Sequence, residues 1–232
     1  MAIICYLAMT AAEFFTTAST PPHMGWMACH FSSSGPGLSN LPSALPPHSL
    51  LLADDSTPFH GHDIEVISAQ LEERANALQV RSVLLDFQRQ NQPEVEELVA
   101  HLQNRLPCSV IAPPWYAPKD APVILPPAPL YQPLEHYLAP YQNREIWLDA
   151  APLAVEISVT ERKCTYSQIP LSNTENLIHQ DNKLHCHYGI QIDASCVRFT
   201  LGRTQEDFLS WLDHAQALGV TAAVGLYQEF AK

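Results

Sequence analysis

Residues 49–54 (SLLLAD) and 81–87 (RSVLLDF) are two short apolar runs, and each is followed by a helical pattern. Both runs are apolar on both faces, as parallel strands covered on both sides require. In residues 63–78, apolar side chains recur at steps of three and four behind an Asp that suits a helix N-cap. Residues 93–106 repeat this pattern behind a proline, with glutamates in the first turn. This order of strand, helix and strand predicts a parallel sheet with right-handed crossovers.

The same alternation continues in both directions along the chain. We expect further helices at residues 204–218 and, shorter, at 133–141. Further strands are expected at residues 3–9, 25–31, 108–113, 121–126, 145–149 and 220–227. About eight such strands would close a small, irregular (β/α)8 barrel, a TIM-like fold that usually needs about 250 residues. An open, doubly wound sheet with an antiparallel edge is the alternative α/β fold.

Residues 154–201 follow a different pattern, in which apolar and polar residues alternate with period two. Strands at 154–160 and 164–169, and at 186–192 and 196–201, are predicted to form hairpins. The polar stretch 171–184 between them is expected to be a mobile loop. We interpret residues 1–232 as a single α/β domain that carries the hairpins 154–201 as an elaboration.

The composition excludes several functional classes. Hydrophobic residues make up 47% of the chain, enough for a sizeable core, and the net charge of −12 argues against broad contact with nucleic acid. No run of roughly 18 apolar residues occurs, so we expect no membrane-spanning helix and no membrane partner. No glycine-rich GxGxxG turn follows a strand, which argues against dinucleotide binding, and we expect no cofactor.

The cysteines and the N-terminus bear on the cellular compartment. The six cysteines form no CxxC pair, and several lie in apolar runs, which is typical of buried free thiols in a reducing compartment. The first residues, MAIICYLAMTAAEF, lack the basic start of a signal peptide and include Glu13. We therefore expect them to form a buried strand, and we expect the protein to be cytoplasmic.

Acidic residues follow several of the predicted strands. In α/β folds, ligands bind beyond the carboxyl ends of the strands, so such acids would converge on one rim. Converging carboxylates repel one another, which raises some of their pKa values and suits general acid–base chemistry. The alternative is that these acids only cap the helices that follow the strands. The acids concerned are Glu13, Asp54, Asp55, Asp86, Asp149 and Glu229.

Aromatic residues also occur near strand ends. Trp115 and Tyr116 follow the strand at 108–113, and Tyr227 ends the last strand. Flat side chains at a barrel mouth can stack on sugar rings, or they can simply cover the rim.

The stretch VRSVLLDFQ ends in Asp86-Phe87-Gln88. Over about eight residues it resembles the strand end of glycoside hydrolase family 18, the chitinase-like (β/α)8 barrels, whose motif closes in Asp-aromatic-Glu. In that family the Glu donates a proton to the leaving oxygen and the Asp orients the substrate. The resemblance implies the orienting role for Asp86. Gln88 stands at the acid position, and an amide cannot donate a proton in this way.

The resemblance therefore implies either a binding protein or an enzyme whose acid comes from another strand, with Asp149 and Glu229 as candidates. Our leading hypothesis is a glycosidase-like barrel that binds a carbohydrate or similar polyol at its C-terminal rim. The candidate catalytic residues are Asp86, Asp149 and Glu229, and the candidate binding residues are Glu13, Asp54, Asp55, Gln88, Trp115, Tyr116 and Tyr227.

Two other functions remain open. One is a metal-dependent hydrolase that uses His60 and His62 with a nearby Asp, because two imidazoles at a strand end can hold a metal ion. His60 and His62 lie several residues past the predicted strand, which argues against this site. The other is a non-enzymatic scaffold or interaction protein, since barrels host many functions. The sequence leaves the oligomeric state open.

Overall fold

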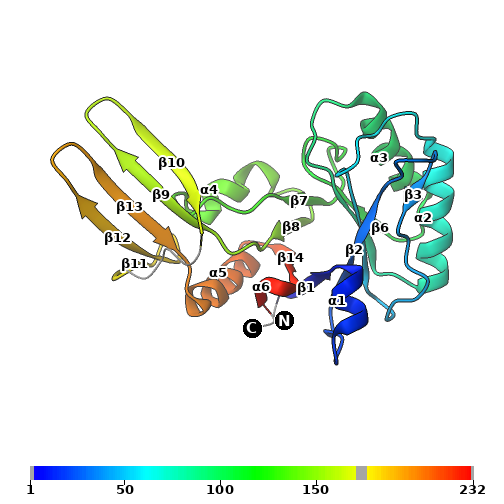
Figure 1. Ribbon diagram of the computed structural model, residues 1–232, viewed down its shortest axis with the longest axis horizontal. Helices are drawn as coiled ribbons and strands as arrows, with labels where there is room; N and C mark the ends of the chain where they lie inside the picture. The colour runs from blue at the N-terminus through cyan, green and yellow to red at the C-terminus, as the bar shows by residue number, and fades with distance from the viewer. Residues whose placement is uncertain (1–2, 171–176, 231–232) are drawn as a thin grey trace. The chain divides into compact units, whose positions relative to one another are not determined.

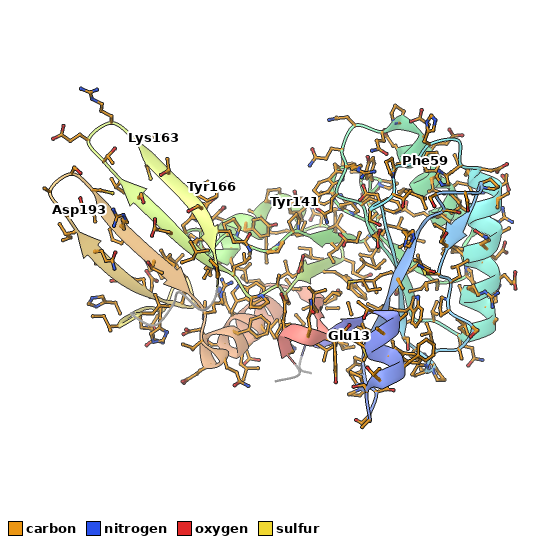
Figure 2. All side chains as sticks on the ribbon, viewed as in Figure 1. Glu13, Phe59, Tyr141, Lys163, Tyr166 and Asp193 are labelled. Carbon is orange, nitrogen blue, oxygen red and sulfur yellow. The ribbon has the colours of Figure 1, made fainter. Side chains whose placement is uncertain are left out.

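The computed structural model describes residues 3–170 and 177–230, and Figures 1 and 2 show its ribbon and side chains. The chain forms two compact units. The barrel unit contains Ile4–Pro126, Asn143–Asp149 and the segment from Thr221 onward. The sheet unit contains Pro127–Gln142 and the described part of Ala150–Val220.

Eight strands of the barrel unit form one sheet in the order β6-β5-β4-β2-β1-β14-β8-β7. They are β1 (Ile4–Met9), β2 (Met24–Phe31), β4 (Leu50–Asp54), β5 (Ser82–Asp86), β6 (Ser109–Ile111), β7 (Val123–Leu125), β8 (Ile146–Asp149) and β14 (Val220–Leu226). A parallel bridge between Ala112 and Val123 joins the two ends, and the N–H of Ile124 donates to the carbonyl of Ala112 at 3.1 Å. The predicted (β/α)8 barrel is confirmed, and the open sheet is wrong.

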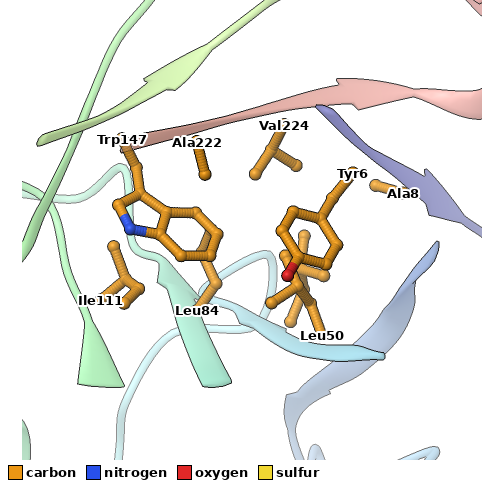
Figure 3. Close-up of a cluster of buried hydrophobic side chains, with 9 residues drawn as sticks. Tyr6, Ala8, Leu50, Leu84, Ile111, Trp147, Ala222 and Val224 are labelled. Atoms are coloured by element: carbon orange, nitrogen blue, oxygen red, sulfur yellow. The ribbon is translucent and has the colours of Figure 1, made fainter. Parts of the chain in front are cut away.

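The inside of the barrel is filled by buried side chains that several strands contribute (Figure 3). Tyr6 from β1 and Trp147 from β8 stack there, with their ring centroids 5.5 Å apart. The cluster consists of Tyr6, Ala8, Leu50, Leu52, Leu84, Ile111, Trp147, Ala222 and Val224. Residues two apart on a strand face the same side. The inward positions of Leu52, Leu84 and Trp147 therefore place the next inward side chains of their strands at the mouth of the barrel.

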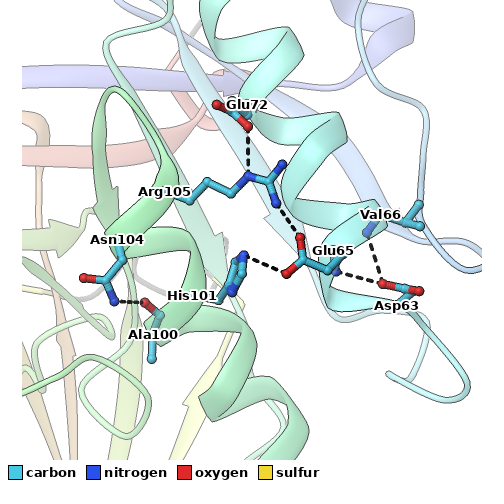
Figure 4. A network of polar contacts seen from close by, with 8 residues as sticks. All are labelled: Asp63, Glu65, Val66, Glu72, Ala100, His101, Asn104 and Arg105. Carbon is cyan, nitrogen blue, oxygen red and sulfur yellow. Dashed lines mark hydrogen bonds and ion pairs between the residues drawn. The ribbon is translucent and has the colours of Figure 1, made fainter.

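The helices of the barrel unit include two that the apolar periodicity predicts. α2 (Ile64–Leu78) is capped at its N-terminus by Asp63, whose Oδ1 accepts the N–H of Glu65 at 2.8 Å. α3 is Pro93–Arg105. Arg105 of α3 binds two carboxylates of α2, Glu65 at 2.7 Å and Glu72 at 2.8 Å (Figure 4). Three short elements of this unit were not predicted: α1 (Ala11–Thr16), β3 (Leu38–Ser39), which pairs antiparallel with β2, and α6 (Tyr227–Phe230).

The sheet unit contains a five-stranded antiparallel sheet in the order β10-β9-β13-β12-β11. Its strands are β9 (Ala154–Val159), β10 (Cys164–Ile169), β11 (His179–Asp181), β12 (Cys186–Ile192) and β13 (Val197–Gly202). The helices of this unit are α4 (Leu134–Leu138), the 3-10 turn η1 (Ala139–Tyr141) and α5 (Gln205–Ala217). The predicted hairpins are confirmed.

The predicted mobile loop at 171–184 is wrong at residues 179–181, which form β11 and pair with β12. Residues 171–176 of that prediction lie outside the described part of the chain. Leu130, Val155, Cys186 and Leu201 form the core of the sheet unit. Among the described residues, no helix has the length and apolar character needed to cross a membrane.

Candidate functional site

Two acidic residues lie side by side at the carboxyl ends of neighbouring barrel strands. Asp54 of β4 is in register with Asp86 of β5, and His30 of β2 is in register with Asp54 on its other side. Asp54 follows Leu50 and Leu52 at steps of two, so it lies on the inward face of its strand. The same alternation applies to Asp86 after Leu84. The strand ends therefore place Asp54 and Asp86, two of the six acids predicted to converge, next to each other at the barrel mouth.

Four of the predicted residues line one small pocket at this mouth. They are Asp86 and Gln88 at the end of β5, Trp115 beyond β6, and Asp149 at the end of β8. Leu85, Pro113, Ile124, Leu125 and Pro126 complete the lining. The pocket volume of about 20 Å³ has room for about one water molecule. A ligand the size of a sugar ring would therefore lie across the mouth rather than inside the pocket.

Asp86, which lines this pocket, has a raised pKa. Burial raises the pKa of Asp86 above its ordinary value, and the negative charges of Asp54 and Asp55 raise it further. The side-chain amide of Gln88 donates a hydrogen bond to Oδ1 of Asp86, which acts in the opposite direction by favouring the charged form. The balance is a carboxyl group that holds its proton to a higher pH than an exposed Asp does.

Asp55 has a different environment from its neighbour Asp54. Its side chain is buried, and its two carboxylate oxygens accept backbone N–H groups from the turn after β5. Oδ1 accepts the N–H of Gln88 at 3.0 Å, and Oδ2 accepts the N–H of Arg89 at 2.7 Å. Asp55 therefore holds residues 87–89, which we call the Gln88 loop, in place.

Two aromatic residues bind the same loop from the segment beyond β6. The indole N–H of Trp115 donates to the carbonyl of Phe87 at 3.1 Å, and the hydroxyl of Tyr116 donates to the carbonyl of Arg89. Tyr116 is buried, whereas Trp115 is partly exposed and lines the pocket. Tyr116 therefore holds the loop by a hydrogen bond from its buried side chain. Trp115 binds the loop through its indole N–H and also contributes to the pocket wall.

Six of the ten predicted residues do not line this pocket: Asp54, Asp55 and Tyr116, described above, and Glu13, Tyr227 and Glu229. Glu13 belongs to α1, where its Oε2 accepts the N–H and the hydroxyl of Thr10 at 2.7 and 2.8 Å in a capping box. The hydroxyl of Tyr227 forms a hydrogen bond with Thr17 Oγ1 at 2.7 Å. Glu229 lies in α6, where burial raises the pKa of its carboxyl group. For Glu13, the alternative of a helix-capping acid is the one that the structure supports.

His62, one of the two histidines proposed for a metal site, has other partners. Nδ1 of His62 accepts the backbone N–H of His60 at 2.9 Å, which leaves Nε2 to donate to the carbonyl of Ser32 at 2.8 Å. Both ring nitrogens of His62 are therefore engaged. Within the described ranges, no group of three or more His, Cys, Asp and Glu residues is arranged to hold a metal ion.

Part of the pocket wall comes from residues that we did not single out in the sequence. Ile124 and Pro126 both lie in the strand predicted at 121–126, and in the structure Ile124 belongs to β7 and Pro126 follows it. Residues 121–126 (APVILP) are apolar throughout, so no alternation in the sequence shows that Ile124 packs against the barrel core and that Pro126 is the next position on that face.

No protein-family model matches the chain, and no curated protein sequence is significantly similar to it. Its fold is similar to that of several solved structures. The chitinase-like agglutinin RobpsCRA from Robinia pseudoacacia has a TM-score of 0.59 at 10% identity, over 95% of this chain and 93% of that chain. The glycoside hydrolase family 18 N-acetylglucosaminidase from Paenibacillus barengoltzii has a TM-score of 0.55 at 10% identity, over 96% and 94%.

A mutant of a plant class V chitinase from Cycas revoluta, solved in complex with (GlcNAc)3, has a TM-score of 0.54 at 11% identity. The match covers 96% of this chain and 94% of that chain. Identities near 10% show the fold alone, and all three matches span nearly the whole chain. The chain therefore has the fold of the chitinase-like (β/α)8 barrels.

Proposed function

We propose that the barrel unit binds a carbohydrate across its mouth and does not hydrolyse it. One observation carries this proposal: Gln88 stands where the resembled family has its acid, and its amide donates to Asp86. An amide has no proton to transfer to a leaving oxygen at neutral pH, so this position supports binding rather than bond cleavage. A chitinase-like agglutinin is among the proteins that share the fold.

The groups at the mouth suit a sugar that is held by hydrogen bonds and by stacking of its ring on one aromatic side chain. Asp54, Asp86 and Asp149 supply carboxylate oxygens that accept sugar hydroxyl or amide protons, and Trp115 supplies an aromatic surface. N-acetylglucosamine oligomers are the ligand class that we propose, because a structure with this fold was solved with (GlcNAc)3. The small pocket would accept a water molecule or a small substituent of one sugar.

Asp149 is the acid that would restore catalysis if the protein were an enzyme. It lies in the same pocket as Asp86 and Gln88. In glycosidases that use two carboxyl groups, these lie about 5–10 Å apart on either side of the bond that breaks. Product formation by the unmodified protein would favour this second role for Asp149 over the binding role.

The test is a calorimetric or NMR titration of the protein with (GlcNAc)3, followed by product analysis after prolonged incubation. We expect saturable binding without cleavage, and at least a tenfold loss of affinity in Asp86→Ala. Glu73→Ala is the matched control, because the Glu73 side chain is 71% exposed on α2 and lies outside the pocket. Absence of binding, or equal binding by Asp86→Ala, would overturn the proposed site, and cleavage would overturn the non-hydrolytic role.

A further inference from the structure

The outer strand of the antiparallel sheet has one edge without a partner. β10 is the first strand in the order β10-β9-β13-β12-β11, and in the described ranges no strand pairs with its outer edge. Figure 2 shows Tyr166 on this strand and Lys163 in the turn before it. Residues 164–168 are exposed. This edge is in the sheet unit and is independent of the proposed carbohydrate site.

The hydrogen-bond pattern of the hairpin identifies the backbone groups on that edge. The N–H of Thr160 donates to the carbonyl of Lys163 at 2.9 Å, so this pair is of the hydrogen-bonded kind. In an antiparallel ladder, hydrogen-bonded and non-hydrogen-bonded pairs alternate. The register of β10 with β9 runs without interruption from Cys164↔Val159 to Ile169↔Ala154. It follows that residues 164, 166 and 168 direct their N–H and C=O groups to the outer edge.

The usual devices that protect such an edge are missing from β10. Natural edge strands carry Lys or other charges, Pro, or a β-bulge, or they are very short. The six residues CTYSQI contain no charge and no proline, and their pairing with β9 contains no bulge. A row of outward N–H and C=O groups is a template for another extended backbone, so a β-strand is the partner that matches the chemistry of the edge.

We propose that β10 pairs antiparallel with β10 of a second copy of this chain. The outward positions 164, 166 and 168 are symmetric about Tyr166, so a two-fold axis at Tyr166 places Tyr166 opposite the partner's Tyr166. The same axis places Cys164 opposite the partner's Gln168. All three outward residues of each copy then form ladder hydrogen bonds, which is the largest number that any register of this strand with itself permits.

Side chains and charge are compatible with this pairing. Tyr166 is in register with Ile157, Phe199 and Ile190 across the sheet, so its side chain continues an apolar row to the edge. Tyr166 is 66% exposed, and pairing would bring the two rings together across the axis. The chain has a net charge of −12, but β10 is uncharged, so two copies meet along this line without like charges in contact.

The small size of the paired surface bears on the stability of this dimer. A pair of six-residue strands buries less than the roughly 1,200–2,000 Å² of a standard stable interface. We therefore expect a weak, reversible dimer whose fraction rises with protein concentration.

The test is sedimentation velocity of the full chain under reducing conditions, from micromolar to about millimolar concentration. We expect a monomer–dimer equilibrium for the unmodified protein and only monomer for Gln168→Lys, which places a charge on the edge. Tyr166→Pro removes an outward N–H that β9 does not use, so it is also expected to be monomeric. Gln180→Lys is the matched control, because it makes the same change at an exposed residue of β11, the strand at the other end of the sheet.

A cross-linking experiment tests the register directly. Gln168→Cys places a thiol opposite the partner's Cys164, so mild oxidation should give a dimer whose bridge mass spectrometry locates between residues 164 and 168. Ser167→Cys should give no such bridge. A protein that stays monomeric at every concentration, or a Gln168→Lys variant that dimerises like the unmodified chain, would overturn the proposal even if Tyr166→Pro fails to fold. A bridge between other positions would overturn the register.

Discussion

Asp55 accepts the backbone N–H of Gln88 through Oδ1 at 3.0 Å, so a carboxylate at the end of one barrel strand fixes the residue beyond the next strand. Its second oxygen accepts the N–H of Arg89 at 2.7 Å. Asp55 is 5% exposed, and water cannot easily replace it in these bonds. The position of Gln88 next to Asp86 therefore depends on a neighbouring residue that does not itself line the pocket.

Replacing Asp55 with Asn should destabilise the barrel unit. An Asn side chain has one oxygen and one NH2 group, so one of the two backbone N–H groups would lose its acceptor. A buried unsatisfied donor costs about 1–3 kcal/mol, and we expect a loss of that size in the free energy of unfolding. Urea unfolding followed by fluorescence measures it, with the exposed Glu73→Gln as control. Unchanged stability would show that Asp55 does not hold the Gln88 loop.

Replacing Gln88 with Glu should introduce a proton donor at the barrel mouth. A second carboxyl group beside Asp86 cannot ionise freely, because like charges at hydrogen-bond distance raise the pKa of one of the pair. The protonated group can then act as a general acid. We expect slow cleavage of (GlcNAc)3 by this variant, detected by chromatography of the products. Gln90→Glu adds the same charge outside the pocket and should remain inactive.

Failure of Gln88→Glu to cleave has a specific meaning if the variant still binds the sugar. It would indicate that the geometry of the mouth, and not only the missing acid, prevents hydrolysis. Loss of binding together with a normal fold would instead show that the Gln88 amide contributes to recognition. These results distinguish a barrel that lacks one group from one whose site has a different shape.

The parts of the fold that could be predicted from the sequence are those with strong local patterns. The two-sided apolar run before Asp86 predicts a buried parallel strand, and Asp63 marks the start of α2. The short helix α1 was missed because AAEFF looks like a continuation of the apolar run of β1, although Thr10-Ala-Ala-Glu13 fits the capping-box pattern that marks a helix start. Glu13 therefore looked like an acid at a strand end, although it closes a capping box with Thr10.

Only part of the site could be predicted from the sequence, again because the local pattern does not contain the information needed for the rest. Asp54 and Asp55 are adjacent in sequence, but the alternation along β4 sends one side chain inward and the other toward the Gln88 loop. Which of the two aspartates faces inward follows from which residues of β4 face inward. A run that is apolar on both faces does not show this in the sequence. The support that Tyr116 gives to the loop depends on contacts between distant segments, which a sequence pattern does not contain.

Asp86 should contribute a pH dependence to the stability of the folded protein, and the substitution Asp86→Asn should remove it. The pKa of Asp86 is raised by burial in the folded protein, so the folded state holds its proton to a higher pH than the unfolded state does. The stability from this group is present below the ordinary Asp pKa and is lost as the pH rises through the raised value. The Tm of Asp86→Asn relative to the unmodified protein should therefore increase between about pH 3 and pH 7. A constant difference across this range would contradict the raised pKa.

Asp207 at the start of α5 should have the opposite pH dependence in the sheet unit. Burial alone would raise the pKa of Asp207, but bonds from His187 at 2.6 Å and from the N–H and hydroxyl of Thr204 at 3.0 and 2.9 Å lower it overall. The stability from Asp207 is present above the ordinary Asp pKa and is lost as the pH falls through the lowered value.

Asp207→Ala should therefore lower the free energy of unfolding most at neutral pH, because it removes a helix cap and leaves the partners of the carboxylate unpaired. We expect a loss of about 2–4 kcal/mol at neutral pH and a smaller loss in acid, measured by urea unfolding at several pH values. Asp213→Ala on the same helix is the control, because the Asp213 side chain is exposed. An equal effect of the two substitutions at neutral pH would show that the bonds from His187 and Thr204 do not stabilise the fold.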